Sequence, residues 1–121
     1  MTPIHPTILD FVPFYSLGCW KEDVGAEVIP SLEETHPILM DDPLSRSDAV
    51  FKCYNVADAM GYPVFALQGG TCLSGPDAEL TFSTNDRSEN CVGGKGGTAE
   101  MDVYKIFGKG IYCLLLVTPK C

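Results

Sequence analysis

The stretch Pro63-Val-Phe-Ala-Leu-Gln-Gly-Gly-Thr-Cys72 predicts a β-hairpin, in which a two-residue turn at Gly69-Gly70 joins two strands. A helix is predicted before it, because apolar side chains recur at helical spacing between positions 49 and 60. Ser47 is a suitable N-cap for this helix, and Gly61 is a suitable C′ residue. The chain is therefore expected to run from a helix directly into a hairpin.

The spacing of two cysteines connects this helix to the hairpin. Cys53 lies eight residues before Gly61, which is about 12 Å along the helix axis. A strand that returns from Pro63 covers about 13 Å by Leu67, and the turn places Leu67 opposite Cys72. Cys72 then lies level with Cys53 along the helix axis, so the geometry predicts a Cys53–Cys72 disulfide.

The predicted fold class is α+β, with one helix stapled by a disulfide onto a small antiparallel β-sheet and with long loops. A length of 121 residues is that of one domain, and 45% hydrophobic with 20% charged residues is a globular composition. Further strands are expected at 16–21 and 101–107, and a long loop at 22–46. The predicted organisation is an extended leader (1–14), a module (15–107) and a hydrophobic C-terminal extension (108–121) that is a candidate hairpin strand.

The six cysteines are an even number without a C-x-x-C pair, which favours disulfides over a zinc site. Only the Cys53–Cys72 bridge follows from geometry; we also predict the bridges Cys19–Cys91 and Cys113–Cys121. Disulfides imply an oxidising compartment, so the predicted location is extracellular. The first 18 residues lack the features of a signal peptide. We favour an export signal outside this sequence over a cytosolic protein with reduced thiols.

The formal net charge of −8 disfavours nucleic acid and anionic membrane surfaces as partners. No membrane span is predicted, because the longest apolar run, residues 111–117, is far shorter than the ~20 residues that a membrane helix needs. The acidic stretch at 22–48 is expected to be a solvated loop, because it lacks the ligand order of a calcium loop. Neither a metal nor a cofactor is expected.

The sequence contains no residue pattern that is typical of catalysis. His5 and His36 each precede a proline, and their spacing implies no partner for general base chemistry. Glu33 and Glu34 are adjacent, so their carboxylates point apart in an extended chain and lie about 100° apart in a helix. We therefore predict that the protein is not an enzyme.

Several short motifs occur in one order along the chain: Ser16-Leu-Gly-Cys-Trp-Lys21, Ile29-Pro-Ser-Leu-Glu33, Lys52-Cys53, Gly61-Tyr-Pro-Val-Phe-Ala-Leu-Gln-Gly-Gly70, Cys72, Asn90-Cys91, the run from Gly93 to Gly97, and Val103-Tyr104. Together they resemble a WSC-like cysteine-rich module of extracellular multidomain proteins from marine invertebrates, over roughly residues 15–107. The architecture resembles that of WSC and PAN/apple modules, in which one helix is stapled onto a small antiparallel sheet. The resemblance implies an extracellular recognition role, with carbohydrate binding attributed to WSC domains generally.

Sugar-binding sites combine an aromatic face, which packs on sugar C–H groups, with amides and carboxylates that bond hydroxyls. Trp20 is a candidate for the aromatic face, and its alternative role is that of a half-buried strand residue beside a disulfide. Gln68 is a candidate for an amide that binds sugar hydroxyls, and its alternative role is that of a hairpin-end residue bonded to the local backbone. The candidate ligand-binding residues are Trp20, Tyr62, Gln68, Asn85, Asp86 and Asn90.

The predicted function is that of a monomeric, non-enzymatic extracellular recognition module that binds carbohydrate. The expected partner is a glycan or an extracellular protein. A neutral or cationic glycan is favoured, because the net charge repels polyanions. Two alternatives remain open: a protein-interaction or structural module of extracellular matrix, and a secreted toxin or inhibitor scaffold with loop 22–46 as its contact surface.

Overall fold

The structure of the chain is a computed structural model, which describes residues 12–22 and 28–107. Most of the expected leader, the C-terminal extension and the predicted Cys113–Cys121 bridge lie outside the described residues. The described part has one main helix on a four-stranded antiparallel sheet, with two disulfides. The predicted α+β class is therefore confirmed.

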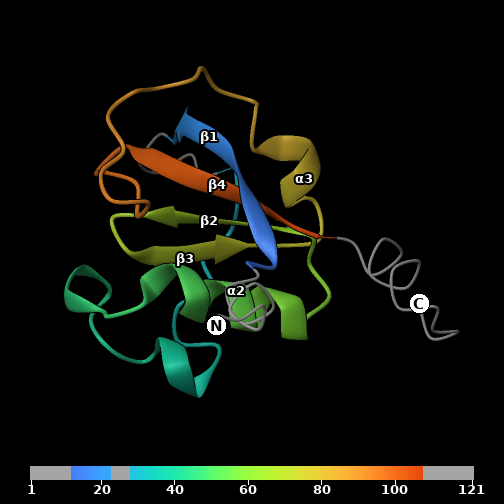
Figure 1. The fold of residues 1–121 in the computed structure, drawn as a ribbon, viewed down its shortest axis with the longest axis vertical. Coiled ribbons are helices and arrows are strands. Elements are labelled where there is room, and N and C mark those ends of the chain that lie inside the picture. The colour runs from blue at the N-terminus through green and yellow to red at the C-terminus, as the bar shows by residue number, and fades with distance from the viewer. Residues whose placement is uncertain (1–11, 23–27, 108–121) are drawn as a thin grey trace, which may run out of the picture.

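The strands lie in the order β1-β4-β2-β3, and every neighbouring pair is antiparallel (Figure 1). The last strand of the chain lies between the first and the second, so β1 and β3 form the two edges. Phe14, which the sequence assigned to the leader, is instead the buried first residue of β1. The strands are β1 Phe14–Lys21, β2 Val64–Gln68, β3 Thr71–Ser74 and β4 Glu100–Ile106.

The β2–β3 hairpin has the predicted register, in which Leu67 pairs with Cys72. Gly69 and Gly70 have positive φ angles of 59° and 88°, as a two-residue turn that matches the strand twist requires. A Cβ atom at Gly70 would overlap the carbonyl group of Pro43. This position therefore needs glycine both for its backbone conformation and for its close packing.

The main helix, α2, spans Ala49–Ala59 and lies against one face of the sheet (Figure 1). The predicted Cys53–Cys72 disulfide joins it to β3, with the two Cα atoms 5.3 Å apart. The predicted N-cap was wrong by one residue: Asp48, with a φ of 52°, occupies the N-cap position in place of Ser47 and makes no side-chain capping hydrogen bond. Residue preferences for side-chain capping therefore could not locate the first residue of the helix.

The C-terminal end of α2 is the one that the sequence predicts. Gly61 has a φ of 80°. Its N–H donates to the Asp58 carbonyl at 3.0 Å, and the Tyr62 N–H donates to the Ala57 carbonyl at 2.9 Å. These two bonds form a Schellman motif, which stops the helix and turns the chain toward β2.

The sheet carries an apolar core on each face, because successive side chains of a strand point to opposite sides. From β2, Phe65 and Leu67 enter the core beneath α2. Val64 and Ala66 enter the second core, which contains Ile29. All four of these β2 residues are fully buried, so this strand lies inside the protein on both faces.

Irregular segments cover both edges of the sheet. Residues 30–33 run along β3, where the Leu32 N–H donates to the Cys72 carbonyl at 2.8 Å. Residues 86–88 run along β1 in the same way. An uncovered edge is a template for pairing with another chain, so both segments protect the protein from such pairing.

The predicted solvated loop is confirmed for Glu34, Asp41, Asp42 and Asp48, which are exposed, but this stretch also contains a buried cation. Arg46 is buried, with its Nη2 2.7 Å from Glu33 Oε1 and its Nε 2.7 Å from Asp41 Oδ1. The Glu33 carboxylate also accepts the Cys72 N–H at 2.8 Å. A buried guanidinium requires such partners, and these bonds tie the loop to β3. Two 3-10 turns lie in this loop, η1 at Pro37–Leu39 and η2 at Pro43–Ser45.

Two further features differ from the expected loops. Glu22 is fully buried, and its carboxylate accepts the N–H of Val28 at 3.2 Å. The turn-rich part before β4 contains a short helix, α3, at Ala78–Thr81. Its Ala78 contributes to the second core, so α3 helps to cover the face of the sheet opposite α2.

Candidate functional site

Residues 85–91, here called the edge segment, lie along the outer edge of β1 and form the candidate site. The Cys19–Cys91 disulfide, which is one of the predicted pairings, holds this segment with the two Cα atoms 6.0 Å apart. The Ser88 N–H donates to the Cys19 carbonyl at 2.9 Å. A covalent bond and backbone hydrogen bonds therefore fix the edge segment on a strand of the sheet.

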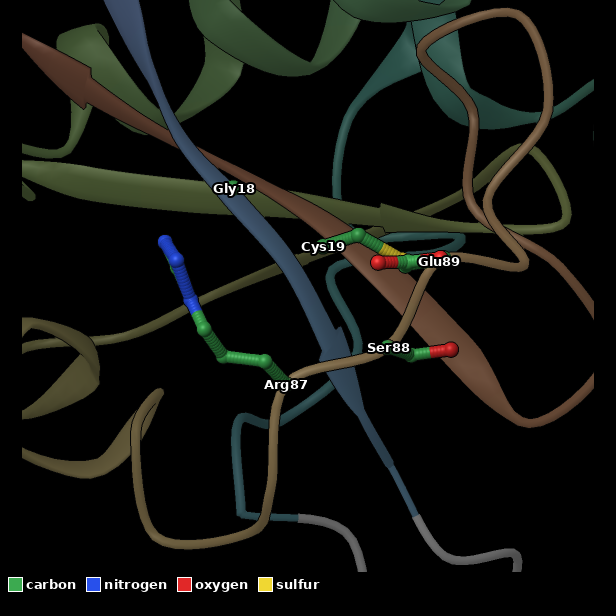
Figure 2. A pocket seen from close by; sticks show the side chains of 5 residues that line it. All are labelled: Gly18, Cys19, Arg87, Ser88 and Glu89. Carbon is green, nitrogen blue, oxygen red and sulfur yellow. The ribbon is translucent and has the colours of Figure 1, made fainter.

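A hollow of about 390 Å³, here called the edge hollow, opens between β1 and the edge segment (Figure 2). Figure 2 shows the Arg87 side chain on one side of β1 and the side chains of Ser88 and Glu89 on the other. The surroundings of the edge hollow therefore combine a cation with hydroxyl and carboxylate oxygens. The lining residues are Gly18, Cys19, Arg87, Ser88 and Glu89.

Trp20 is a half-buried strand residue, in keeping with its alternative role. Its Nε1–H donates to the Leu17 carbonyl at 3.0 Å, and its ring meets Phe82 edge-to-face with centroids 5.3 Å apart. The guanidinium carbon of Arg87 lies 4.8 Å from the centre of the indole ring. A ligand that approaches from this side would meet the guanidinium before it met the indole.

A β-bulge in β1 leaves room for Arg87. The register with β4 shifts between Ser16 and Gly18, so Leu17 has no partner there. Gly18 has a φ of 105°, and a Cβ atom at this position would lie 2.8 Å from Arg87 Nη2. Bulges commonly re-aim side chains next to functional sites. Here the bulge and the missing side chain together accommodate the guanidinium.

The Arg87 guanidinium has few partners. Its Nη2 is 3.5 Å from the Leu17 carbonyl, and it forms no ion pair within the described residues. Arg46 differs, because hydrogen bonding to Glu33 raises its pKa and Asp41 supplies a second carboxylate. A guanidinium has five N–H donors, so most donors of Arg87 remain available to a ligand.

The structure brings four of the predicted ligand-binding residues to this edge. Trp20 lies in β1, whereas Asn85, Asp86 and Asn90 lie in the edge segment. Asn85 Nδ2 donates to the Lys21 carbonyl at 3.2 Å. The side chains of Asp86 and Asn90 are exposed and make no hydrogen bond within the described part of the chain. Their polar groups are therefore open to a ligand.

The other two predicted residues lie elsewhere. Tyr62 follows α2 and packs against the core between α2 and the sheet. Gln68 ends β2, and its Nε2 donates to the carbonyl of Thr98 at 2.9 Å, 30 positions along the chain rather than in the local backbone. None of the six predicted ligand-binding residues is among those that line the edge hollow, but Trp20, Asp86 and Asn90 are each next in the chain to a lining residue, whereas Tyr62 and Gln68 are not.

Sequence reasoning missed four of the lining residues: Gly18, Arg87, Ser88 and Glu89. One usable signal was Arg87, which is one of only two arginines in an acidic chain and lies near a cysteine among turn-forming residues. Gly18 offered no such signal, because its bulge exists only once β1 has paired with β4.

A second hollow, of about 440 Å³, lies at the N-terminal end of α2 and is lined in part by Gly93 and Lys95. Hydrogen bonds to side chains of β4 hold the glycine-rich turn beside it against the sheet. The Gly96 N–H donates to Asp102 Oδ2 at 2.9 Å, and the Tyr104 hydroxyl donates to a backbone carbonyl of the turn at 2.7 Å. Burial raises the pKa of Tyr104 to about 12, so this hydroxyl stays a donor at physiological pH.

Within residues 12–22 and 28–107, no group of three or more His, Cys, Asp or Glu side chains is arranged to hold a metal ion. The helices of the same ranges are all too short or too polar to cross a membrane. His36 has a local structural role, because its Nδ1 accepts the Ile38 N–H at 3.3 Å and so caps η1.

No protein-family model, no curated protein and no solved structure matches the chain significantly. The resemblance to WSC-like and PAN/apple modules therefore stays a prediction from the sequence motifs. The geometry of the edge hollow has to carry the functional argument, because a small α+β fold by itself does not imply a function.

Proposed function

We propose that the protein is a non-enzymatic extracellular recognition module that binds carbohydrate at the edge hollow. The observation that carries this proposal is the gathering of Trp20, Asn85, Asp86 and Asn90 along β1. They come from two distant segments of the chain. Their amides and carboxylate are the donors and acceptors that sugar hydroxyls require.

The rigid attachment of the edge segment supports this proposal. Binding is weakened when a loop must become ordered around its ligand, and a preformed site avoids most of that loss. The Cys19–Cys91 bridge and the pairing with β1 hold the edge segment before any ligand arrives. The two disulfides of the described part also suit the oxidising conditions outside the cell.

A glycan array that displays neutral, cationic and anionic oligosaccharides tests the proposal with the purified protein. Binding to several related glycans is expected. The double variant Asp86→Ala/Asn90→Ala should lose most of this binding, because it removes exposed polar groups of the edge segment. The control variant Gln68→Ala changes a polar side chain away from the edge hollow and should bind as the wild type does. Silence across the array, or equal losses in both variants, would contradict the proposal.

A second candidate function is a protein-interaction module of the extracellular matrix. It is favoured by Met40 and Leu44, which are 63% and 79% exposed on the loop that follows β1. Contiguous exposed apolar patches often mark protein-binding surfaces, and this candidate requires that these two side chains contribute to such a patch. A silent glycan array, combined with binding to matrix proteins that Met40→Ser/Leu44→Ser abolishes, would favour this second candidate.

A further inference from the structure

We infer that the ligand of the edge hollow is a sugar that carries a single carboxylate, a uronate, and that Arg87 binds this carboxylate. The inference rests on the proposed function, because it assigns a chemical class to the glycan of the same site. It departs from the neutral or cationic glycan that net charge alone predicts, because the edge hollow is lined by a cation, Arg87, that has no ion pair within residues 12–22 and 28–107.

The first argument is the availability of the Arg87 guanidinium. The other arginine, Arg46, has a side chain that is 0% exposed and shares its donors among Glu33, Asp41 and the Gly70 carbonyl. Arg87 is exposed and has no carboxylate partner within the described residues, although the chain is acidic. Its parallel N–H donors therefore remain available for a carboxylate that comes from a ligand.

The second argument is that Arg87 is held in place before binding. Its guanidinium lies over Trp20, 4.8 Å from the ring centre, which is the geometry of a cation–π contact. The bulge at Gly18 provides the space, since a Cβ atom there would lie 2.8 Å from Arg87 Nη2. A guanidinium whose position is already set loses less rotamer freedom when it binds a carboxylate.

The third argument is the chemistry of the rest of the edge hollow. Ser88 and Glu89 also line it, and Figure 2 shows them across β1 from Arg87. The Ser88 Oγ accepts the Asn90 N–H at 3.1 Å and keeps its own proton to donate. The exposed Glu89 carboxylate accepts hydroxyl protons. A ligand that binds Arg87 on one side of β1 and Ser88 and Glu89 on the other carries one carboxylate and several hydroxyl groups, as a uronate does.

The acidic neighbours limit the ligand to one negative charge. Asp86 and Glu89 are exposed on either side of Arg87 in the edge segment. A sulfated or otherwise polyanionic chain would bring further charges near these carboxylates, and the repulsion would be offset only by the exposed Lys21 at the end of β1. Planar, bidentate pairing with Arg87 also favours a carboxylate over a compact anion.

The test compares three small sugars by NMR chemical-shift titration of the full chain: methyl glucuronide, its methyl ester and methyl glucoside. Charge-assisted hydrogen bonds exceed neutral ones enough that the glucuronide should bind about 10-fold more tightly than the other two. Arg87→Gln should remove this preference, and Arg87→Lys should restore only part of it, because lysine cannot pair in a bidentate manner. Lys95→Gln, at the second hollow, should leave the preference intact.

Each other result overturns the inference in a distinguishable way. Equal binding of the three sugars, unaffected by Arg87→Gln, would refute the carboxylate and leave the proposed carbohydrate function standing. Equal affinity for acetate and methyl glucuronide would show a general carboxylate site in which the sugar has no part. No binding of any of these sugars, together with a silent glycan array, would refute the inference and the proposed function together.

Discussion

The two edges of the sheet have the same components, but the arginine is buried at one edge and exposed at the other. At each edge an irregular segment pairs with the outer strand, a disulfide lies nearby, and an arginine extends beside it. At the β3 edge, Arg46 is buried and bound to Glu33 and Asp41. At the β1 edge, Arg87 is exposed on Trp20 without a carboxylate partner in the described part of the chain.

The difference in burial means that the charge of Arg46 stabilises the fold, whereas the charge of Arg87 is available for binding. Removing a guanidinium from water is unfavourable unless carboxylates and carbonyls satisfy it, so the burial of Arg46 is possible only with its partners. Arg87 remains hydrated and needs no such partners. The β3 edge is therefore expected to govern stability, whereas the β1 edge is expected to govern ligand binding.

The largest expected effects come from removing a disulfide at each edge. The sequence separations of 19 and 72 residues correspond to about 3 kcal/mol for Cys53–Cys72 and about 4 kcal/mol for Cys19–Cys91 from chain entropy. Replacing Cys53 and Cys72 by alanine should cost more than this entropy, because both side chains are fully buried. Urea unfolding of the two double alanine variants measures these losses.

Hydrogen exchange locates the damage in the same two variants. Loss of the Cys19–Cys91 bridge should speed exchange most at Ser88, whose N–H bonds to the Cys19 carbonyl. Loss of the Cys53–Cys72 bridge should instead speed exchange throughout α2 and the β2–β3 hairpin. An identical pattern in both variants would mean that the two edges do not open independently.

Two glycines with positive φ give the next comparison. Gly70→Ala should cost about 3 kcal/mol or more, because backbone strain adds to an overlap with the rigid Pro43 carbonyl. Gly18→Ala should cost about 1–2 kcal/mol, because the nearest atom is a side-chain nitrogen of Arg87, which can shift more easily than a backbone carbonyl. Thermal unfolding midpoints test this order, and an equal shift in both variants would refute the argument from packing.

Substituting the two arginines should also destabilise the protein more at the β3 edge than at the β1 edge, but with smaller losses than the glycine substitutions. Arg46→Met leaves Glu33 without its charge partner beside β3, at a cost of about 2–3 kcal/mol. Arg87→Met removes only an exposed cation–π contact, at a cost of about 0.5–1 kcal/mol. Chemical unfolding of the two methionine variants measures both. A larger loss from Arg87→Met would assign Arg87 a structural role.

The smallest expected effect is a pH dependence at the β3 edge. The hydrogen bond from Arg46 holds the pKa of Asp41 below its ordinary value of 3.8. A lowered pKa in the folded state contributes stability that is present above the ordinary value and is lost as pH falls through the lowered one. Asp41→Asn should therefore flatten the fall in unfolding free energy below about pH 4. A wild-type slope in Asp41→Asn would contradict this role of the Arg46 hydrogen bond.

The candidate site could be predicted only in part from the sequence. Side-chain chemistry makes Asn85, Asp86 and Asn90 candidates, because amides and carboxylates bind hydroxyls wherever they are exposed. It could not show that Tyr62 and Gln68 lie away from the edge hollow, because their place relative to it depends on the order of the strands. The N-cap of α2 shows the same limit at short range, since Asp48 occupies this position in place of Ser47 without a side-chain capping hydrogen bond.

The sequence by itself determined the helix, its glycine stop, the β2–β3 hairpin and the Cys53–Cys72 bridge. These features depend on helical period, turn geometry and a separation of only 19 residues, all of which are local. Only the tertiary structure decided that β4 lies between β1 and β2, that Arg46 is buried and that Arg87 is not. The physical reason is that these outcomes depend on contacts between distant segments, such as the pairing of Phe14 with Ile106, which local propensities do not specify.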